Sequence, residues 1–310
     1  HKIINNMKRL TIAIISSILL LSCIGKDQSR KNNQISNTMI TDSTKQYGHN
    51  LDFLKKYTEV IELKNGNSAL ALVPSWQGRV MTSTSEGTHG FSFGWINHEL
   101  IASGNALPHI NPYGGEERLW LGPEGGQYSI FFKKGDEFIY ENWQTPAFLD
   151  TIPFKVTIVS DSSATFTHDV EIKNYSGTTF KLGIERKVTL LTAGQIVKEA
   201  GIDLAGTNFV AYRSENKLTN MGSDIWKKES GLLSVWMLGM FNPSPAVTVV
   251  IPVRQGNEKE LGVQVNDNYF GKISGDRLKI SGNNIYFRAD GKSRGKIGIP
   301  PLRATDRLGS

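Results

Sequence analysis

One stretch of the sequence gathers most of the side chains that could do chemistry on a polar ligand. It begins with His109 and continues through Gly114 to Gln127, where three carboxylates, one guanidinium and one indole stand between two Gly-Gly pairs. Glycine pairs permit positive φ and a close approach of backbone to a ligand. An indole face stacks on the apolar side of a pyranose, while Arg, Glu, Asn and His side chains hydrogen-bond to its hydroxyl groups. This combination predicts a saccharide site.

The residues expected to contact the saccharide lie in this stretch and in the segments before and after it. They are Arg79, Trp95, His98, Asn111, Arg118, Trp120, Gln127 and Trp143. Polar loops of this kind are more often functional than structural. The competing interpretation makes the glycine pairs tight turns, places Trp120 in the core and joins Glu116 to Arg118 in a salt bridge.

The elements that must position these residues are predicted to be strands. The chain of 310 residues contains 31 Gly and 11 Pro, and Asn-Gly, Ser-Gly and Asp-Gly pairs punctuate it as hairpins do. Residues 51–57 predict a short helix, and 58–63 with 68–73 predict a hairpin around Asn65-Gly66. Further strands are expected at 79–83, 127–132, 154–160, 164–174, 179–191, 195–208, 210–217, 232–238, 246–252, 262–265, 278–281, 284–289 and 296–299. The fold class is therefore all-β, a large antiparallel sandwich with few short helices.

The N-terminal segment predicts a targeting signal. Lys8 and Arg9 precede the apolar run Leu10 to Leu21, which is shorter than a membrane-spanning helix needs and fits a secretory signal. The run ends in Leu-Leu-Ser-Cys23, which resembles the lipobox of bacterial lipoproteins, where cleavage exposes a cysteine that then takes a lipid. We expect an extracytoplasmic protein anchored to a bacterial membrane through Cys23. The alternative is an uncleaved signal anchor.

Composition divides the rest of the chain. Residues 1–6 precede the expected start at Met7, and residues 24–50 are rich in Ser, Thr, Asn, Gln and Lys, which predicts a flexible tether. Residues 51–310 are expected to form a single β domain, with a sheet edge that can be missing at its C-terminal end.

Charge and motifs exclude several function classes. The formal net charge of +6 falls to +3 without Lys2, Lys8 and Arg9, and the remaining cations are scattered among acids, so no nucleic-acid partner is expected. A single cysteine excludes an internal disulfide framework and a cysteine-based zinc cluster. The sequence contains no His-Glu-x-x-His, calcium-loop, Gly-x-Ser-x-Gly, P-loop or dinucleotide fingerprint. We therefore expect no metal and no cofactor.

Two segments resemble a known superfamily. Leu72 to Ser83 resembles the early strand-turn-strand of galactose mutarotase-like proteins, which include the aldose 1-epimerases. Gly114 to Gln127 is similar to a stretch in uncharacterised secreted lipoproteins of the same superfamily. The similarity extends over roughly residues 51–310, with its specific part at 73–127. It implies a β-supersandwich with a carbohydrate-binding groove on a concave sheet, which does not by itself imply turnover.

The resemblance also implies roles for individual residues. In an aldose 1-epimerase a general acid protonates the ring oxygen while a general base takes the anomeric hydroxyl proton. The family uses a histidine as acid, which implies His109, with His98 second. No glutamate occupies the family's late position, so the base is expected to be Asp267, which could equally cap a turn, or Glu116 or Glu124 from the glycine-rich stretch.

The leading hypothesis is thus an anchored lipoprotein that binds a saccharide and acts on it as an aldose epimerase or related carbohydrate-active enzyme. The alternative is a non-catalytic carbohydrate-binding lipoprotein that holds glycans at the cell surface through Trp95, Trp120 and Trp143. A third hypothesis is a structural lipoprotein without a ligand.

Overall fold

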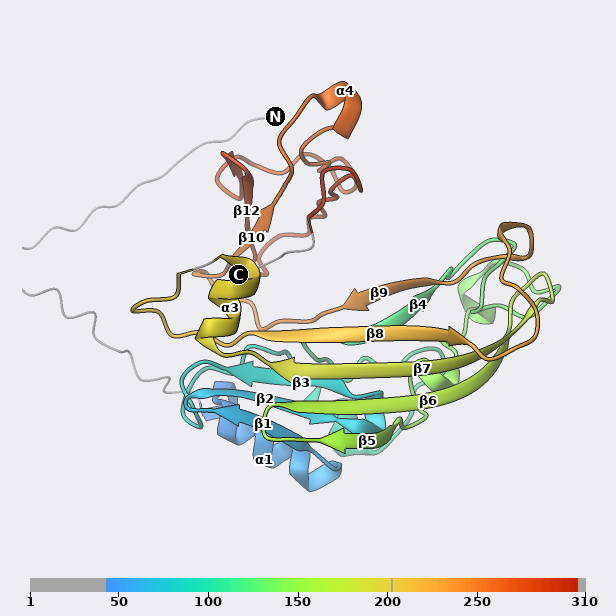
Figure 1. The fold of residues 1–310 in the computed structure, drawn as a ribbon, viewed down its shortest axis with the longest axis horizontal. Helices are drawn as coiled ribbons and strands as arrows, with labels where there is room; N and C mark the ends of the chain where they lie inside the picture. Colours follow the sequence, from blue (N-terminus) through green and yellow to red (C-terminus); the bar gives the residue numbers. More distant parts are fainter. Residues whose placement is uncertain (1–42, 202, 306–310) are drawn as a thin grey trace, which may run out of the picture. The chain divides into compact units, whose positions relative to one another are not determined.

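The computed structural model describes residues 43–201 and 203–305, in which every strand pair is antiparallel (Figure 1). The sheets are β1-β2-β3, β4-β9, β5-β6-β7-β8 and β10-β12-β11. Their strands are β1 Ile61–Asn65, β2 Ser68–Val73, β3 Arg79–Thr84, β4 Arg118–Gly122, β5 Lys155–Val159, β6 Ser163–Lys173, β7 Thr179–Leu190, β8 Tyr212–Asn220, β9 Ser234–Leu238, β10 Thr248–Pro252, β11 Leu278–Ser281 and β12 Asn284–Arg288. The helices are α1 Tyr47–Tyr57, α2 His98–Ser103, α3 Ala193–Ala200 and α4 Glu258–Leu261, with short 3-10 turns η1 Ser43–Lys45, η2 Pro74–Trp76, η3 Tyr140–Asn142, η4 Ala147–Leu149 and η5 Lys228–Ser230. The predicted all-β class with few short helices is confirmed.

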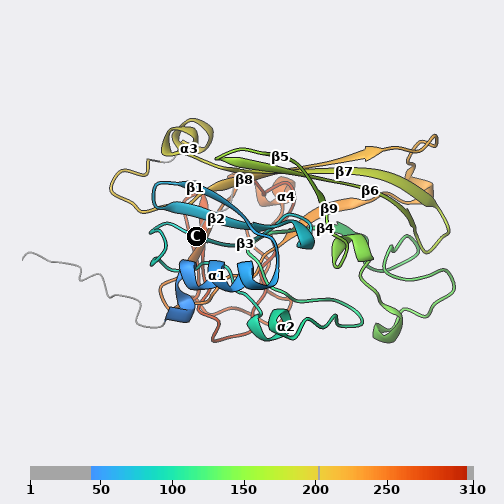
Figure 2. The ribbon, with the colours of Figure 1, turned by 90° about the horizontal axis from the view of Figure 1, so that it is seen from below.

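The β1–β2 hairpin forms where the sequence predicts it. Asn65 pairs with Ser68 across Gly66, whose φ of +59° is the left-handed conformation that a two-residue turn requires. Because successive side chains of a strand point to opposite faces, the two faces of β2 pack in different hydrophobic clusters. Leu70 and Leu72 pack in a cluster with residues of β6 and β7, whereas Ala69, Ala71 and Val73 pack with Tyr47, Leu51 and Leu54 of α1. The β1–β3 sheet is thus covered on both faces (Figure 2).

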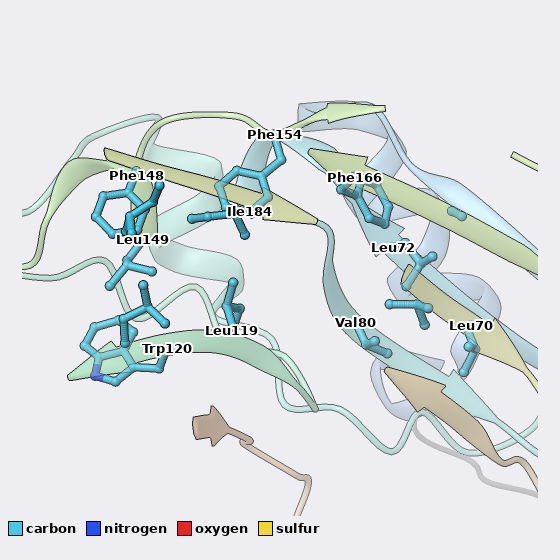
Figure 3. Packing of buried hydrophobic residues seen from close by; sticks show 14 of the residues in the cluster. Leu70, Leu72, Val80, Leu119, Trp120, Phe148, Leu149, Phe154, Phe166 and Ile184 are labelled. Carbon is cyan, nitrogen blue, oxygen red and sulfur yellow. The ribbon is translucent and has the colours of Figure 1, made fainter. Parts of the chain in front are cut away.

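The main core joins three of the sheets. Leu119 and Trp120 of β4, Phe166 of β6 and Ile184 of β7 are buried together with the β2 leucines (Figure 3). Phe148 and Leu149 of η4 complete the same cluster. Full burial of one such side chain contributes about 1.5 to 3 kcal/mol, so this core dominates the stability of the sandwich.

Strand β7 alternates between exposed and buried positions, as a half-buried strand should. One of its inward positions is Arg186, whose side chain is 0% exposed. A buried guanidinium is costly unless it is paired and hydrogen-bonded. The inward face of the β5–β8 sheet therefore has to supply a polar network at this point.

Four predicted strands are wrong. In place of 195–208 the chain forms α3, which begins with a capping box in which Thr192 and Gln195 exchange hydrogen bonds, so the first N–H groups of the helix are satisfied locally. At 127–132 the Ser129 N–H donates to the carbonyl of Gly126, a turn bond instead of a ladder bond. Segments 262–265 and 296–299 form no strand in the described structure, although Gly298 in the second segment makes an isolated bridge to Asn266, just after the first.

The folded part starts earlier than predicted. Helix α1 begins at Tyr47 and not at Leu51, because Tyr47 and Asn50 are already buried. Cys23, the signal segment and residues 24–42 of the predicted tether lie outside the described residues. Across 43–201 and 203–305, no helix combines the length and apolarity that crossing a membrane requires.

Candidate functional site

Gly114 forms a bridge with Ile96, and the three charged residues that follow the Gly114-Gly115 pair are all buried in the protein interior. Both glycines have positive φ, +95° and +107°, and a side chain at Gly114 would collide with the carbonyl oxygen of Trp95. The space beside Gly114 is therefore filled by the backbone of Trp95, and the glycine is needed for packing within the protein. Glu116 and Glu117 follow the turn directly, and both are buried.

Glu116 is 3% exposed and has hydroxyl partners. The Ser83 hydroxyl lies 2.8 Å and 2.9 Å from its two oxygens, and the Tyr212 hydroxyl donates to Oε2 at 3.4 Å. Burial raises the pKa of Glu116 to about 7, although the hydrogen bonds from Ser83 and Tyr212 oppose the rise. Burial and the nearby Glu116 charge raise the pKa of Tyr212, which keeps its phenol protonated. Glu116 can therefore give or take a proton near neutral pH.

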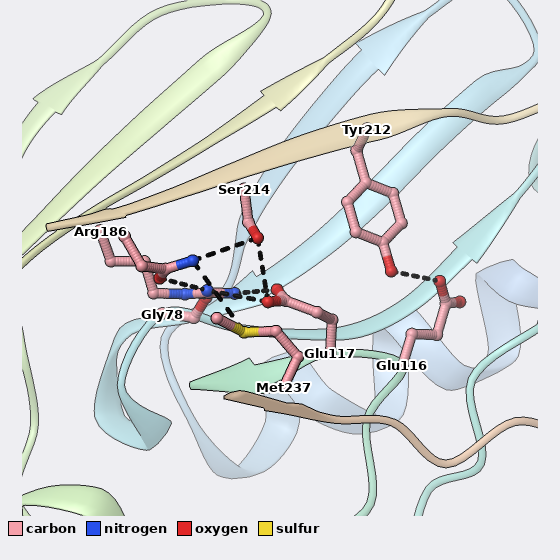
Figure 4. A network of polar contacts seen from close by, with 8 residues as sticks. Gly78, Glu116, Glu117, Arg186, Tyr212, Ser214 and Met237 are labelled. Carbon is pink, nitrogen blue, oxygen red and sulfur yellow. Dashed lines mark hydrogen bonds and ion pairs between the residues drawn. The ribbon is translucent and has the colours of Figure 1, made fainter. Parts of the chain in front are cut away.

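Glu117 forms a bidentate ion pair with Arg186, in which Nη1 lies 3.0 Å from Oε1 and Nη2 contacts Oε2 (Figure 4). The Ser214 hydroxyl donates to the same carboxylate oxygen at 3.0 Å, and Arg186 Nη1 donates to Asn216 Oδ1 at 2.9 Å. Arg186 Nε reaches the carbonyl of Gly78 at 3.2 Å. A bidentate pair with these further bonds satisfies both buried charges. Ser83, Glu116, Glu117, Arg186, Tyr212, Ser214 and Asn216 together form what we call the carboxylate network.

The carboxylate network adjoins an exposed apolar surface. Asn216 Nδ2 lies 4.0 Å from the sulfur of Met237 in β9, a residue that is exposed. The backbone of Trp95 bonds to Met240 at 2.9 Å, and Met240 bonds in turn to the carbonyl of Gly115 at 2.8 Å. Trp95, Met240 and Phe241 are all exposed. A ligand lying along β8 and β9 would meet aromatic faces as well as the half-buried hydroxyl and amide groups of β8.

Comparison with known proteins locates the chain in one family. A profile described as a family of unknown function (DUF6786) matches residues 45–310. The chain belongs to this family. No curated protein and no solved structure matches it.

Three predicted binding residues of the DUF6786 chain come together around Asp150. Arg118 Nη2 lies 3.3 Å from Asp150 Oδ1, and Asn111 donates to Oδ2 from its backbone at 3.0 Å and its side chain at 2.8 Å. Arg79 is close enough for its pKa to respond to both Arg118 and Asp150. All four are buried. The salt bridge of the competing interpretation is wrong, because Arg118 pairs with Asp150 and not with Glu116.

Trp120 lies in the core of the DUF6786 chain with 1% of its surface exposed. Its indole Nε1 donates to Glu124 Oε1 at 2.6 Å, and the Arg118 guanidinium lies 4.5 Å from the ring. Both the ring and its polar edge are thus occupied by protein groups. This part of the competing interpretation is right, since Trp120 is a core residue and Glu124 satisfies its N–H.

His109 and Trp143 meet in a separate place. His109 Nδ1 lies 2.7 Å from the Trp143 carbonyl oxygen and 2.7 Å from Gln144 Nε2, and its ring centre is 4.6 Å from that of Tyr140. The rings of Tyr140 and Trp143 are nearly parallel, at 15°. A cavity of about 320 Å³ is lined by Ile110, Phe132, Phe138, Ile139, Tyr140 and Trp143. We call these six residues the aromatic recess.

The remaining predicted residues are dispersed. His98 Nε2 bonds to Asn50 Oδ1 at 2.7 Å at the start of α2, and burial lowers its pKa. Gln127 is exposed in a turn. Asp267 accepts from Lys272 Nζ at 2.9 Å, a hydrogen bond that lowers the pKa of Asp267. Within the described part of the chain, none of the three shares a hydrogen bond or ion pair with the carboxylate network.

Sequence reasoning missed the partners of Glu116 and Glu117. Ser83, Arg186, Tyr212, Ser214 and Asn216 come from β3, β7 and β8. Arg186 carried a usable signal, since it occupies an inward position of a strictly alternating strand, where a cation requires a buried acid. As to metals, no group of three His, Cys, Asp or Glu side chains in residues 43–201 and 203–305 could hold an ion.

Proposed function

We propose that this DUF6786 protein binds a saccharide along β8 and β9 and acts on it by proton transfer, as an aldose epimerase or a related carbohydrate-active enzyme. The observation that supports the proposal is Glu116. It is buried, it has hydroxyl partners, it pairs with no cation among residues 43–201 and 203–305, and its pKa is about 7. A carboxyl group with these properties is suited to acid–base chemistry at neutral pH. The antiparallel β fold is compatible with the mutarotase-like superfamily that the sequence resembles.

Opening of a sugar ring requires proton transfer to and from the sugar, and residues of the carboxylate network can carry it out. At neutral pH Glu116 is divided between its two protonation states, so one form can take the anomeric hydroxyl proton and the other can return a proton to the sugar. Tyr212 stays protonated and contacts Glu116, which makes it the second proton-bearing group of the site. Ser214 and Asn216 are held by the Glu117–Arg186 pair and can hydrogen-bond to sugar hydroxyls.

The aromatic recess favours the alternative function, carbohydrate binding without chemistry. Tyr140 and Phe138 are exposed, and Tyr140 and Trp143 present nearly parallel rings beside a cavity. Parallel aromatic faces with an imidazole at the edge are a common way to hold a pyranose. In this alternative His109 acts as a hydrogen-bonding partner of the sugar and not as a general acid.

Polarimetry on fresh α-D-glucose and α-D-galactose separates the two functions. If the carboxylate network is catalytic, Glu116→Gln should slow mutarotation roughly 100-fold, because a general acid–base group contributes about that much. Glu185→Gln changes an exposed glutamate on β7 and is the matched control. Wild-type turnover in Glu116→Gln contradicts catalysis at this site. Sugar binding without turnover that Tyr140→Ala weakens supports the alternative.

The proposed location is extracytoplasmic, in the periplasm or at the cell surface, with the protein anchored to a bacterial membrane through a lipid on Cys23, which lies outside the described residues. Cys23→Ser should abolish lipid labelling and release the protein into the soluble fraction. Membrane retention in the unlabelled variant would contradict the anchor.

A further inference from the structure

Arg79 presents a buried guanidinium edge that no protein group uses. It is 1% exposed, and its Nη1 donates to the carbonyl of Gly114 at 3.0 Å. Its Nε and Nη2 have no hydrogen-bond partner among the residues that the structure describes. These two nitrogens lie on the same edge of the planar group, and this edge binds both oxygens of a carboxylate through parallel hydrogen bonds. A buried cation with two unsatisfied N–H groups is costly, which points to a ligand that satisfies them.

The charges around Arg79 favour an anion. Asp150 is the neighbouring carboxylate, and it already accepts from Arg118 and Asn111. Two buried guanidiniums therefore share one carboxylate, and Arg118 also has an unpartnered Nε. Burial lowers the pKa of Arg79 well below its usual range, and the Arg118 cation lowers it further. A second carboxylate would balance the charge of this cluster.

The same region offers a hydrogen-bond acceptor and an aromatic wall. Gln77 is buried, its Oε1 is unpartnered, and its Nε2 donates at 2.9 Å to the carbonyl of Ile152, two residues after Asp150. The ring of Tyr113 lies 5.9 Å from the Arg79 guanidinium and stacks on Trp76 at 4.4 Å. Trp76 and Tyr113 are both half-buried, so part of each ring is open to solvent. Such a set fits a ligand that carries a carboxylate, a hydroxyl and a ring face.

We propose that the saccharide is acidic and that Arg79 binds its carboxylate, so that the substrate class is a uronate. This inference rests on the proposed saccharide function. The aliphatic part of Arg79 packs against Gly115, and Gly115 is followed by Glu116, so the proposed carboxylate-binding side chain adjoins the segment that carries the acid–base group. The flat two-donor edge matches a carboxylate better than a phosphate or sulfate ester, although all three share the anionic chemistry.

Calorimetric titration of the full chain with six sugars tests the proposal. The probes are D-glucuronate and D-galacturonate, the neutral D-glucose and D-galactose, and their 6-phosphates, at one ionic strength. The uronates should bind at least 10-fold more tightly than the neutral sugars and more tightly than the phosphates. Arg79→Met should remove that preference, while Arg79→Lys, which keeps the charge without the fork, should retain part of it. Arg288→Met, at an exposed arginine of β12, should change nothing.

The outcomes separate this inference from the proposed function. Equal affinity for uronates and neutral sugars overturns the carboxylate assignment and leaves saccharide binding in place; ordered water alone would then satisfy Arg79. Tighter binding of the phosphates also overturns it. Failure of all six sugars to bind contradicts both. If Arg79→Met does not fold, thermal melts of the wild type decide, since uronates should raise the melting temperature more than the neutral sugars do.

Discussion

The carboxylate network and the aromatic recess are built in opposite ways. The network takes its side chains from strands and their flanks, and Glu116 is 3% exposed. The recess takes Ile110 from the segment before β4 and its other five side chains from the connection between β4 and β5, and Tyr140 is 63% exposed. Burial changes the proton affinity of a carboxyl group, whereas exposure leaves an aromatic ring free to contact a ligand. The first region is therefore suited to proton transfer and the second to binding.

The difference predicts where substitutions are costly. Arg186→Met leaves the Glu117 carboxylate buried without its cation, so the free energy of unfolding should fall by about 3 to 5 kcal/mol. Urea denaturation measures the loss. Arg213→Met, which breaks an exposed pair with Glu199, should cost about 0 to 1 kcal/mol. Similar losses in the two variants would show that burial does not distinguish the pairs.

The two tryptophans that face each other across β4 and β9 sharpen the comparison. Trp120 pairs in register with Trp236, yet Trp120 is 1% exposed and Trp236 is 43% exposed. Trp120→Ala should reduce the free energy of unfolding by about 3 to 5 kcal/mol because it opens a cavity in the core. Trp236→Ala should cost about 1 kcal/mol or less. A larger loss in Trp236→Ala would mean that β9 is covered in solution.

The pH dependence of stability isolates Glu116. Its pKa is about 7 in the folded chain against an ordinary 4.5, so the folded state holds the proton more tightly than the unfolded state. The contribution of this protonation to the free energy of unfolding is complete below pH 4.5 and is lost as the pH rises through 7, a change of about 3 kcal/mol. Denaturation at several pH values should show this loss in the wild type and in Glu185→Gln, but not in Glu116→Gln. An unchanged profile in Glu116→Gln contradicts the raised pKa.

The smallest effect is expected in the aromatic recess. Tyr140→Ala should weaken saccharide binding by about 3- to 10-fold through the loss of one stacking face, and should leave stability within about 0.5 kcal/mol. Calorimetry and a thermal melt measure the two quantities. Tyr269→Ala removes another exposed tyrosine and serves as control. A large loss of stability in Tyr140→Ala would make the recess part of the core.

Local patterns predicted much of the fold. Asn65-Gly66 sets its hairpin through turn geometry, and the alternation of β6 and β7 can be read along each strand without knowledge of its partner. The sequence predicts a strand at 195–208, whereas the chain forms α3 there, whose first turn is closed by the local capping box of Thr192 and Gln195. Strands at 262–265 and 296–299 were wrong because short apolar runs have no decisive period.

By itself, the sequence determined the all-β class and the presence of a charged cluster behind a glycine turn. These follow from backbone preferences and composition, which act over a few residues. Only the tertiary structure decided that Arg118 pairs with Asp150, that Glu117 pairs with Arg186 and that Tyr212 reaches Glu116. Such pairs join segments that are far apart in the chain, and the pKa of Glu116 depends on the protein packed around it, so neither can be read from neighbouring residues.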